Sequence, residues 1–146
     1  MAGELEARLQ RLEDLQEIGQ IFVDYGRLLD LGDFAAFSRL VAIDGEILLG
    51  PYGRATGPAA IEALMVQAIG PIVGHSYHVI SSPVIELDGD TATAEVMWTV
   101  VDRDDHGKPR LGGIGRHRDA LVRENGRWRI KKRRGQVDIP SAIAPA

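Results

Sequence analysis

Apolar residues recur at steps of three and four over residues 5–29, with Glu, Gln and Arg between them. This spacing predicts one long amphipathic helix. Gly32 is placed to end this helix, and Asp33 is placed to cap a second, short helix over Phe34–Val41. The first forty residues are therefore predicted to be helical.

A short apolar segment, Glu46–Leu49, follows the predicted helices and ends in a Gly/Pro-rich turn at 50–53. A third helix is predicted over Ala59–Ile69, with Pro58 near its first position, where a missing backbone N–H costs nothing. The Gly-Pro pair that begins at Gly70 ends this helix.

The second half of the chain is rich in Val, Ile, Thr and Tyr, and much of it alternates apolar and polar residues. The pairs Asp88-Gly89 and Asn125-Gly126 are typical of tight turns between antiparallel strands. Helices followed by hairpin-connected strands predict an α+β fold, with a curved antiparallel sheet that three helices cover on one face. We expect a conical pocket between the sheet and the helices. The predicted strands are His75–Leu87, Thr91–Arg103, Leu111–Arg123 and Arg127–Val137.

Length and composition narrow the class of protein. With 146 residues the chain suits one domain, for which we expect a core over about residues 5–138 and a loose tail over 139–146. Because there is no cysteine, disulfide scaffolds, zinc ribbons and thiol nucleophiles are excluded. No apolar run reaches the roughly 18 residues of a membrane span, and the polar N-terminus is not a signal peptide, so a cytoplasmic location without membrane contact is predicted.

Positive charge is concentrated near the C-terminus, where residues 103–134 hold twelve Lys or Arg against four Asp or Glu. This concentration raises nucleic acid as a partner, but the few aromatic residues and the net charge of −4 argue against it. A strand that buries Trp128 and Ile130 and points its charges outward explains the run equally well. An anionic substrate group that reaches Arg133 or Arg134 is a further alternative. We expect no metal, since no ligand spacing is present.

Four segments resemble the SnoaL-like branch of the nuclear transport factor 2-like superfamily, and together they span about residues 5–138. The resemblance implies a cone-shaped, cystatin-like fold, a homo-oligomer (dimer or trimer) and chemistry without a cofactor. Members include polyketide cyclases, dehydratases, a dehydrochlorinase, isomerases and non-catalytic binders, so the fold does not determine the function. The segments are LEDLQEIGQIFVDYGRLLDLGDFAAFSRLVAIDGEI, GRATGPAAIEALM, YHVISSPVIELDGDTATAEVMWTVVD and ENGRWRIKKR.

The dehydratase-type members of this superfamily imply catalytic positions. Their helical Tyr and Asp correspond to Tyr25 and Asp30, and their strand His corresponds to His78. A further Asp corresponds to Asp102, and a second catalytic His corresponds to His117. The arginine on their last strand has no counterpart, because Val137 stands near that place. Trp98, Tyr77 and Tyr52 complete the candidate substrate-binding set with Asp102.

These residues predict acid–base chemistry in an apolar pocket. His78, oriented by Asp30, would abstract a proton from a small hydrophobic cyclic substrate, and Tyr25, His117 or Asp102 would assist the leaving group. The alternatives are structural: Asp30 can be a surface partner of its helix neighbour, and His78 a hydrogen-bonded core residue. An ideal helix also places Tyr25 and Asp30 about 140° apart, which is unfavourable for a shared pocket.

Two classes of function follow from the sequence. The first is a lyase of the dehydratase type, with an isomerase or cyclase as its variant when there is no leaving group. The second is a non-catalytic module for small-molecule binding or assembly. A hydrogen bond between Asp30 and His78 favours the first class, and a cone filled by Trp98 and its neighbours favours the second.

Overall fold

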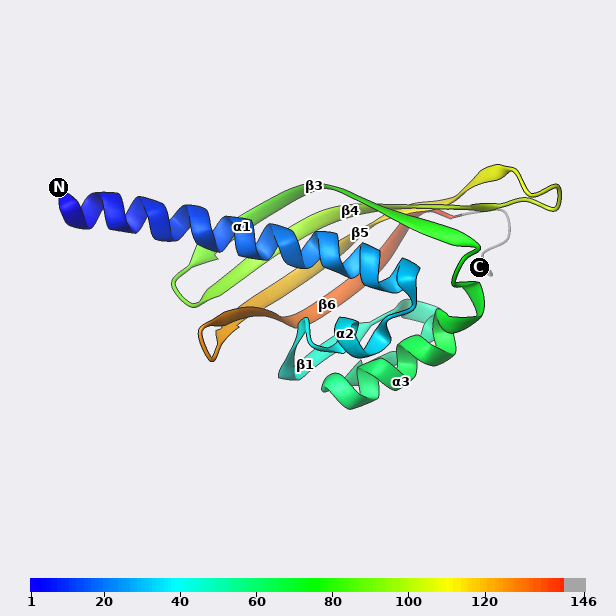
Figure 1. Cartoon of the computed structure of the whole chain (residues 1–146), viewed down its shortest axis with the longest axis horizontal. Coiled ribbons are helices and arrows are strands. Elements are labelled where there is room, and N and C mark those ends of the chain that lie inside the picture. The colour runs from blue at the N-terminus through cyan, green and yellow to red at the C-terminus, as the bar shows by residue number, and fades with distance from the viewer. Residues whose placement is uncertain (141–146) are drawn as a thin grey trace.

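Helix α1 (Ala2–Leu31) opens the computed structural model, which describes residues 1–140. Gly32 ends the helix in the left-handed conformation, with a φ of 72°, as its position in the sequence predicts. The first turns extend beyond the sheet, so the apolar stripe is buried only from the middle of the helix onward (Figure 1). The exposed leucines of those turns are Leu5, Leu9 and Leu12.

Two shorter helices complete the helical part. Asp33 caps α2 (Phe34–Ser38) by accepting a hydrogen bond from the Ala36 N–H at 3.0 Å. This helix is shorter than predicted, because Val41 already pairs with the last strand and begins β1 (Val41–Leu48). Helix α3 (Pro58–Ala68) lies one residue earlier than predicted. The 3-10 turn η1 (Gly50–Tyr52) follows β1, and the 3-10 turn η2 (Gly70–Ile72) follows α3.

A single six-stranded sheet has the order β2-β1-β6-β5-β4-β3. The α+β class and the curved sheet with three helices are thereby confirmed. The predicted sheet was wholly antiparallel, whereas β1 and β6 are parallel. The prediction also missed the short β2, which lies in the segment assigned to a turn and a helix start. The remaining strands are β2 (Arg54–Thr56), β3 (Ser76–Asp88), β4 (Thr91–Arg103), β5 (Pro109–Glu124) and β6 (Arg127–Pro140).

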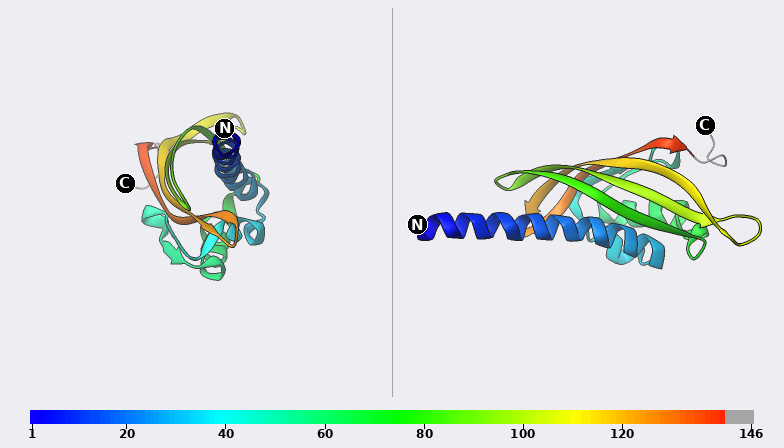
Figure 2. Two further views of the ribbon diagram at one scale, coloured as in Figure 1. Left: turned by 90° about the vertical axis from the view of Figure 1, so that its left-hand side faces the viewer. Right: turned by 90° about the horizontal axis from the view of Figure 1, so that it is seen from above.

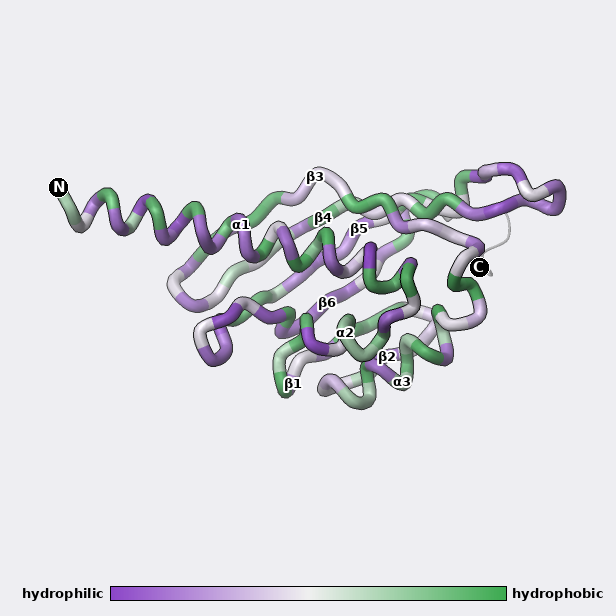
Figure 3. Tube along the Cα trace, in the orientation of Figure 1, coloured by the Kyte–Doolittle hydropathy of each residue, from purple (hydrophilic) through white to green (hydrophobic). Residues whose placement is uncertain are grey.

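The sheet curves around one side of α1, which runs along its inner face (Figure 2). Apolar and polar residues alternate along the strands, in keeping with one covered face (Figure 3). The first of two irregularities along β6 changes that alternation: Leu121 pairs with Ile130, but the preceding Ala120 pairs with Lys132, so Lys131 is an extra residue. The predicted loose tail begins inside β6, at residue 139, and residues 141–146 lie outside the described residues.

A polar cluster fastens the middle of α1 to the sheet. The buried carboxylate of Asp14 accepts hydrogen bonds from Arg123 at 2.9 and 3.0 Å and from Nε1 of Trp128 at 2.9 Å. Burial acts to raise the pKa of Asp14, but these hydrogen bonds outweigh it and the pKa is lowered. Glu17, one turn further on, accepts the backbone N–H of Trp128 at 3.0 Å. The last half of α1 is thereby held in place over the strands.

Candidate functional site

Asp30 and His78 meet where the end of α1 crosses β3. Nδ1 of His78 lies 2.7 Å from Oδ1 of Asp30, and the side chains are 12% and 14% exposed. The same carboxylate accepts the backbone N–H of His78 at 3.0 and 3.1 Å. Because β3 is an edge strand, this N–H would otherwise lack a partner in the sheet. Asp30 therefore holds both the backbone of β3 and the imidazole ring of His78 in position.

Gly26 explains why the helix comes close enough for this contact. It lies four residues before Asp30, so both face β3 from the same side of α1. A Cβ at Gly26 would lie 2.9 Å from Cγ1 of Ile80 and 3.4 Å from the carbonyl oxygen of His78. A larger residue would move α1 away from β3, and Asp30 with it.

The hydrogen bond determines which nitrogen of His78 is basic. An ionised carboxylate only accepts hydrogen bonds, so the hydrogen resides on Nδ1. The lone pair is then on Nε2, the nitrogen that a general base uses. In this arrangement Asp30 also stabilises the imidazolium that would form on proton uptake.

Tyr25 points to a different part of the interior from Asp30, as helix geometry predicts. Its ring packs against His117 of β5, with centroids 5.1 Å apart, and against Phe37 at 4.9 Å. The guanidinium carbon of Arg133 lies 4.0 Å from the same ring centroid. Burial raises the pKa of the Tyr25 phenol, so its hydroxyl stays protonated. Tyr25 and Asp30 thus contact opposite sides of the curved sheet, β5 and β6 in one case and β3 in the other.

Arg133 and Asp119 form a buried ion pair that the sequence interpretation missed. Their side chains are 1% and 0% exposed, and the guanidinium donates through Nε, at 2.7 Å, and through Nη2 to the two carboxylate oxygens. Strict alternation from Trp128 and Ile130 would have pointed Lys132 inward, but the extra residue Lys131 brings in Arg133 instead. Since Asp119 occupies the fork of Arg133, this arginine is not free to bind an anionic substrate group.

Trp98 lies on the inner face of β4, beside His117, with ring centroids 6.1 Å apart. Its ring rests on two glycines of β5, because a Cβ at Gly115 would collide with Cζ2, and one at Gly113 would lie 3.6 Å from Cζ3. The indole is only partly buried and lies along the neighbouring strand. It forms a flat wall there.

Of the candidate substrate-binding residues, Asp102 lies near His78 and two others do not. Asp102 stands two positions along β4 from Val100, the residue opposite His78, and makes a two-point ion pair with Arg110 at 2.9 and 3.2 Å. Tyr77 precedes His78 on β3, so it faces the opposite side of the sheet and is 64% exposed. Tyr52 lies in η1 and is 59% exposed. The structure brings together Asp30 and His78, and, across the interior, Tyr25, His117 and Trp98.

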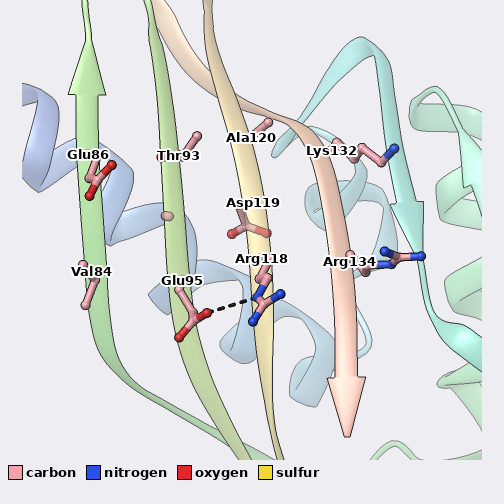
Figure 4. Close-up of a pocket in the computed structure, with 10 residues that line it drawn as sticks. Val84, Glu86, Thr93, Glu95, Arg118, Asp119, Ala120, Lys132 and Arg134 are labelled. Carbon is pink, nitrogen blue, oxygen red and sulfur yellow. Dashed lines mark hydrogen bonds and ion pairs between the residues drawn. The ribbon is translucent and has the colours of Figure 1, made fainter.

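A separate open groove of about 520 Å³ crosses the outer face of the sheet. Charged side chains of both signs border it, among them Glu86 and Lys132, and Glu95 accepts a hydrogen bond from Nε of Arg118 at 3.1 Å (Figure 4). His78 and its partners are on the other face. The groove is therefore not part of the candidate site.

His117 is the most strongly perturbed histidine of the interior. Burial lowers its pKa well below the ordinary 6.5, and the charge of Arg133 and the nearby His78 act in the same direction. The ring is therefore neutral in the folded protein at neutral pH.

This burial predicts a loss of stability in mild acid. The unfolded chain binds a proton at His117 below pH 6.5, whereas the folded chain does not, so stability falls as the pH is lowered. We expect the free energy of unfolding to fall by up to about 1.4 kcal/mol per pH unit below that value. Urea denaturation across this range measures the slope. His117→Asn should flatten it, and equal slopes in the two proteins would contradict the assignment.

The geometry also bears on metal binding and membrane insertion. Within residues 1–140, no group of three or more His, Asp or Glu side chains is arranged to hold a metal ion. In the same part of the chain, no helix combines the length and the apolar character that a membrane span requires.

The curved sheet and the long helix that covers its inner face together define a class of small α+β proteins. A model of the SnoaL-like domain matches residues 10–134, which is most of the chain. The protein belongs to the SnoaL-like family. No curated protein matches the chain.

Solved structures agree with this assignment. An NTF2-like protein with a cystatin-like fold from Novosphingobium aromaticivorans is 32% identical, with a TM-score of 0.86, and the match covers 96% of this chain and 92% of that one. Aln2 from a Streptomyces species is 28% identical over 86% of this chain and 91% of its own, with a TM-score of 0.75. LinA, at 18% identity and a TM-score of 0.82, covers 95% and 99% of the two chains and supports the fold alone.

Proposed function

We propose that this protein is a cofactor-independent lyase that eliminates water, or a related leaving group, from a small hydrophobic cyclic substrate. One observation carries the proposal: the 2.7 Å hydrogen bond between Nδ1 of His78 and Asp30, which leaves Nε2 as a base. The SnoaL-like family supports it, because dehydratases are among the members that the chain resembles.

In the proposed reaction, Nε2 of His78 takes a proton from a carbon next to an electron-withdrawing group. The electrons of that C–H bond form the new double bond, and the leaving oxygen departs with the electrons of its bond to the ring. The proton held on His78 then passes to this oxygen, so that water leaves and the imidazole is neutral again. Asp30 stabilises the imidazolium meanwhile. Burial keeps Tyr25 protonated and His117 neutral, which are the forms in which each could exchange a hydrogen bond with a substrate oxygen.

The same base can serve an isomerase or a cyclase, and the product distinguishes them. If there is no leaving group, the proton returns to another carbon and the mass of the substrate is unchanged. A polyketide-type cyclisation forms a new carbon–carbon bond. We therefore favour elimination and treat rearrangement, cyclisation and binding without turnover as the outcomes that would replace it.

The test is a turnover assay of the purified protein on cyclic β-hydroxyketones, with the products identified by mass spectrometry. We expect loss of one water per substrate and a new absorbance from the conjugated enone. In deuterium oxide, substrate recovered before completion should carry deuterium at the carbon next to the carbonyl if proton abstraction is reversible. Products of unchanged mass would replace the lyase by an isomerase, and no reaction with bound substrate would favour a binding module.

A further inference from the structure

The exposed leucines in the first turns of α1 form an apolar stripe that faces away from the sheet. Leu5, Leu9 and Leu12 are each more than half exposed. Leu9 and the fully buried Ile18 are nine residues apart, which is about two and a half helical turns, so they point in opposite directions. The exposed leucines therefore do not continue the buried stripe, and neither the sheet nor the other helices cover them.

This stripe has the seven-residue period of a coiled coil. When Leu9 is counted as position a, apolar residues occupy both seam positions, a and d, of the first two heptads. The exposed Gln16 takes the next a position, and beyond it a Cβ at Gly19 would meet nothing within 4 Å. The seam residues are Ala2, Leu5, Leu9, Leu12, Gln16, Gly19 and Val23.

The charges beside the seam favour a parallel partner of the same sequence. Arg8 takes position g, Glu13 takes position e of the following heptad, and both side chains are exposed. In a parallel pair of identical helices, these two positions of opposite copies face each other, so Arg8 and Glu13 would make two symmetric ion pairs. In an antiparallel pair the e positions face each other, and Glu6 would then repel Glu13.

The fold already provides the helix that such pairing requires. An isolated helix of two or three turns is marginal in water, and the cost of forming it would oppose association. Here the first turns continue a helix that is anchored from its middle, where Asp14 binds Arg123 and Trp128 and where Ile18 lies in the core. The same turns project beyond the sheet, so a second helix can lie along them without meeting the strands (Figure 1).

We propose that two copies of this protein associate through a parallel pairing of their α1 helices, with Leu5, Leu9 and Leu12 of each copy in the seam. A two-fold axis along the pair relates the copies. Because the stripe faces away from the sheet, the two sheets lie on the outer sides of the helix pair. The surface is separate from Asp30 and His78, so this inference does not depend on the proposed function.

The first measurement is sedimentation equilibrium of the purified protein. We expect a species of twice the chain mass of 15.9 kDa. Leu9→Glu should raise the Kd of this dimer by about tenfold or more, because it places two carboxylates in an apolar seam. Leu31→Glu is the matched control, since Leu31 is an exposed leucine of α1 outside the seam, and it should leave the Kd unchanged. Both positions are exposed, so both variants should fold, which circular dichroism checks.

The charged pair provides a test of orientation. Arg8→Glu and Glu13→Arg should each weaken self-association about fivefold, because each places like charges opposite one another at two symmetric positions. An equal mixture of the two variants should associate as tightly as the wild type. In the mixed dimer, residue 8 of each copy again meets an opposite charge at residue 13 of the other.

Introduced cysteines show which residues meet, because the chain has none of its own. Ala2→Cys lies in the seam, and parallel pairing brings its two copies together, so mild oxidation should join them by a disulfide. Ala7→Cys lies on the opposite side of the helix and should remain a free thiol.

Three results would overturn the inference. They are a protein that stays monomeric up to about 1 mM, a dimer that Leu9→Glu leaves intact, and cross-linking of Ala7→Cys in preference to Ala2→Cys. If Val79→Glu, on the outer face of β3, abolished the dimer while Leu9→Glu did not, the interface would lie on the sheet instead.

Discussion

Replacing His78 with alanine is expected to lower kcat of the proposed elimination by about 10²–10⁴-fold. The general base is then missing, while the fold around it is retained. Asp30→Asn should cause a loss in the same range, because an amide cannot stabilise the imidazolium as a carboxylate does. Since the two residues act as a unit, the double variant should be little worse than His78→Ala alone. Steady-state kinetics on the dehydrated product measures each loss.

The control for these variants is His106→Ala. His106 lies in the loop between β4 and β5, where its backbone N–H, not its ring, bonds to Asp104 at 2.8 Å. We expect it to keep wild-type kcat. Circular dichroism must show that Asp30→Asn is folded, because Asp30 also holds the backbone of His78. A His78→Ala protein with undiminished kcat would exclude this histidine as the base.

Asp119→Ala is expected to lower the free energy of unfolding by about 3–5 kcal/mol. The variant leaves the guanidinium of Arg133, which is 1% exposed, as a buried charge without its partner. For a domain whose total stability is about 5–15 kcal/mol, this is a large fraction. Urea denaturation monitored by fluorescence measures the change.

A double variant separates the cost of an unpaired charge from the value of the pair. Asp119→Leu with Arg133→Met replaces both charges by apolar groups and should recover most of the loss, as other buried pairs do. Glu95→Ala serves as the control, because the pair of Glu95 with Arg118 is largely exposed and should be worth less than about 1 kcal/mol. If Asp119→Ala and Glu95→Ala lowered the free energy of unfolding equally, burial of the Asp119–Arg133 pair would have no effect on stability.

The fold was predictable from the sequence in large part because its signals are local. Gly32 and Asp33 mark a helix end and a cap, and the Asp88-Gly89 and Asn125-Gly126 turns separate the strands that the structure has. The parallel pairing of β1 with β6 was not predictable in this way, since it joins segments that are far apart in the chain. Short β2 carries only three residues, too few for a pattern.

Less of the candidate site than of the fold was predictable from the sequence. The approach of Asp30 to His78 followed from the resemblance to dehydratases, and the structure has the two side chains in contact, although their catalytic role stays a prediction. Tyr77 was a candidate substrate-binding residue, but it precedes His78 on β3, and neighbouring residues of a strand face opposite ways. The partnership of Arg133 with Asp119 was missed, because it depends on one irregular backbone position and not on residue type.

The extra residue at Lys131 shifts by one the positions of β6 whose side chains face the interior. Before it, the even-numbered Trp128 and Ile130 face the interior, and directly after it the odd-numbered Arg133 does. In a strand of unbroken phase, Lys132 would occupy the place beside Asp119, and Arg133 would lie in solvent. Tyr25 would then face a compact ammonium instead of a flat guanidinium, whose planar fork matches a carboxylate at two points. A single inserted position thus determines which of two adjacent cations the core contains, and with it the shape of the donor group that Asp119 and Tyr25 meet.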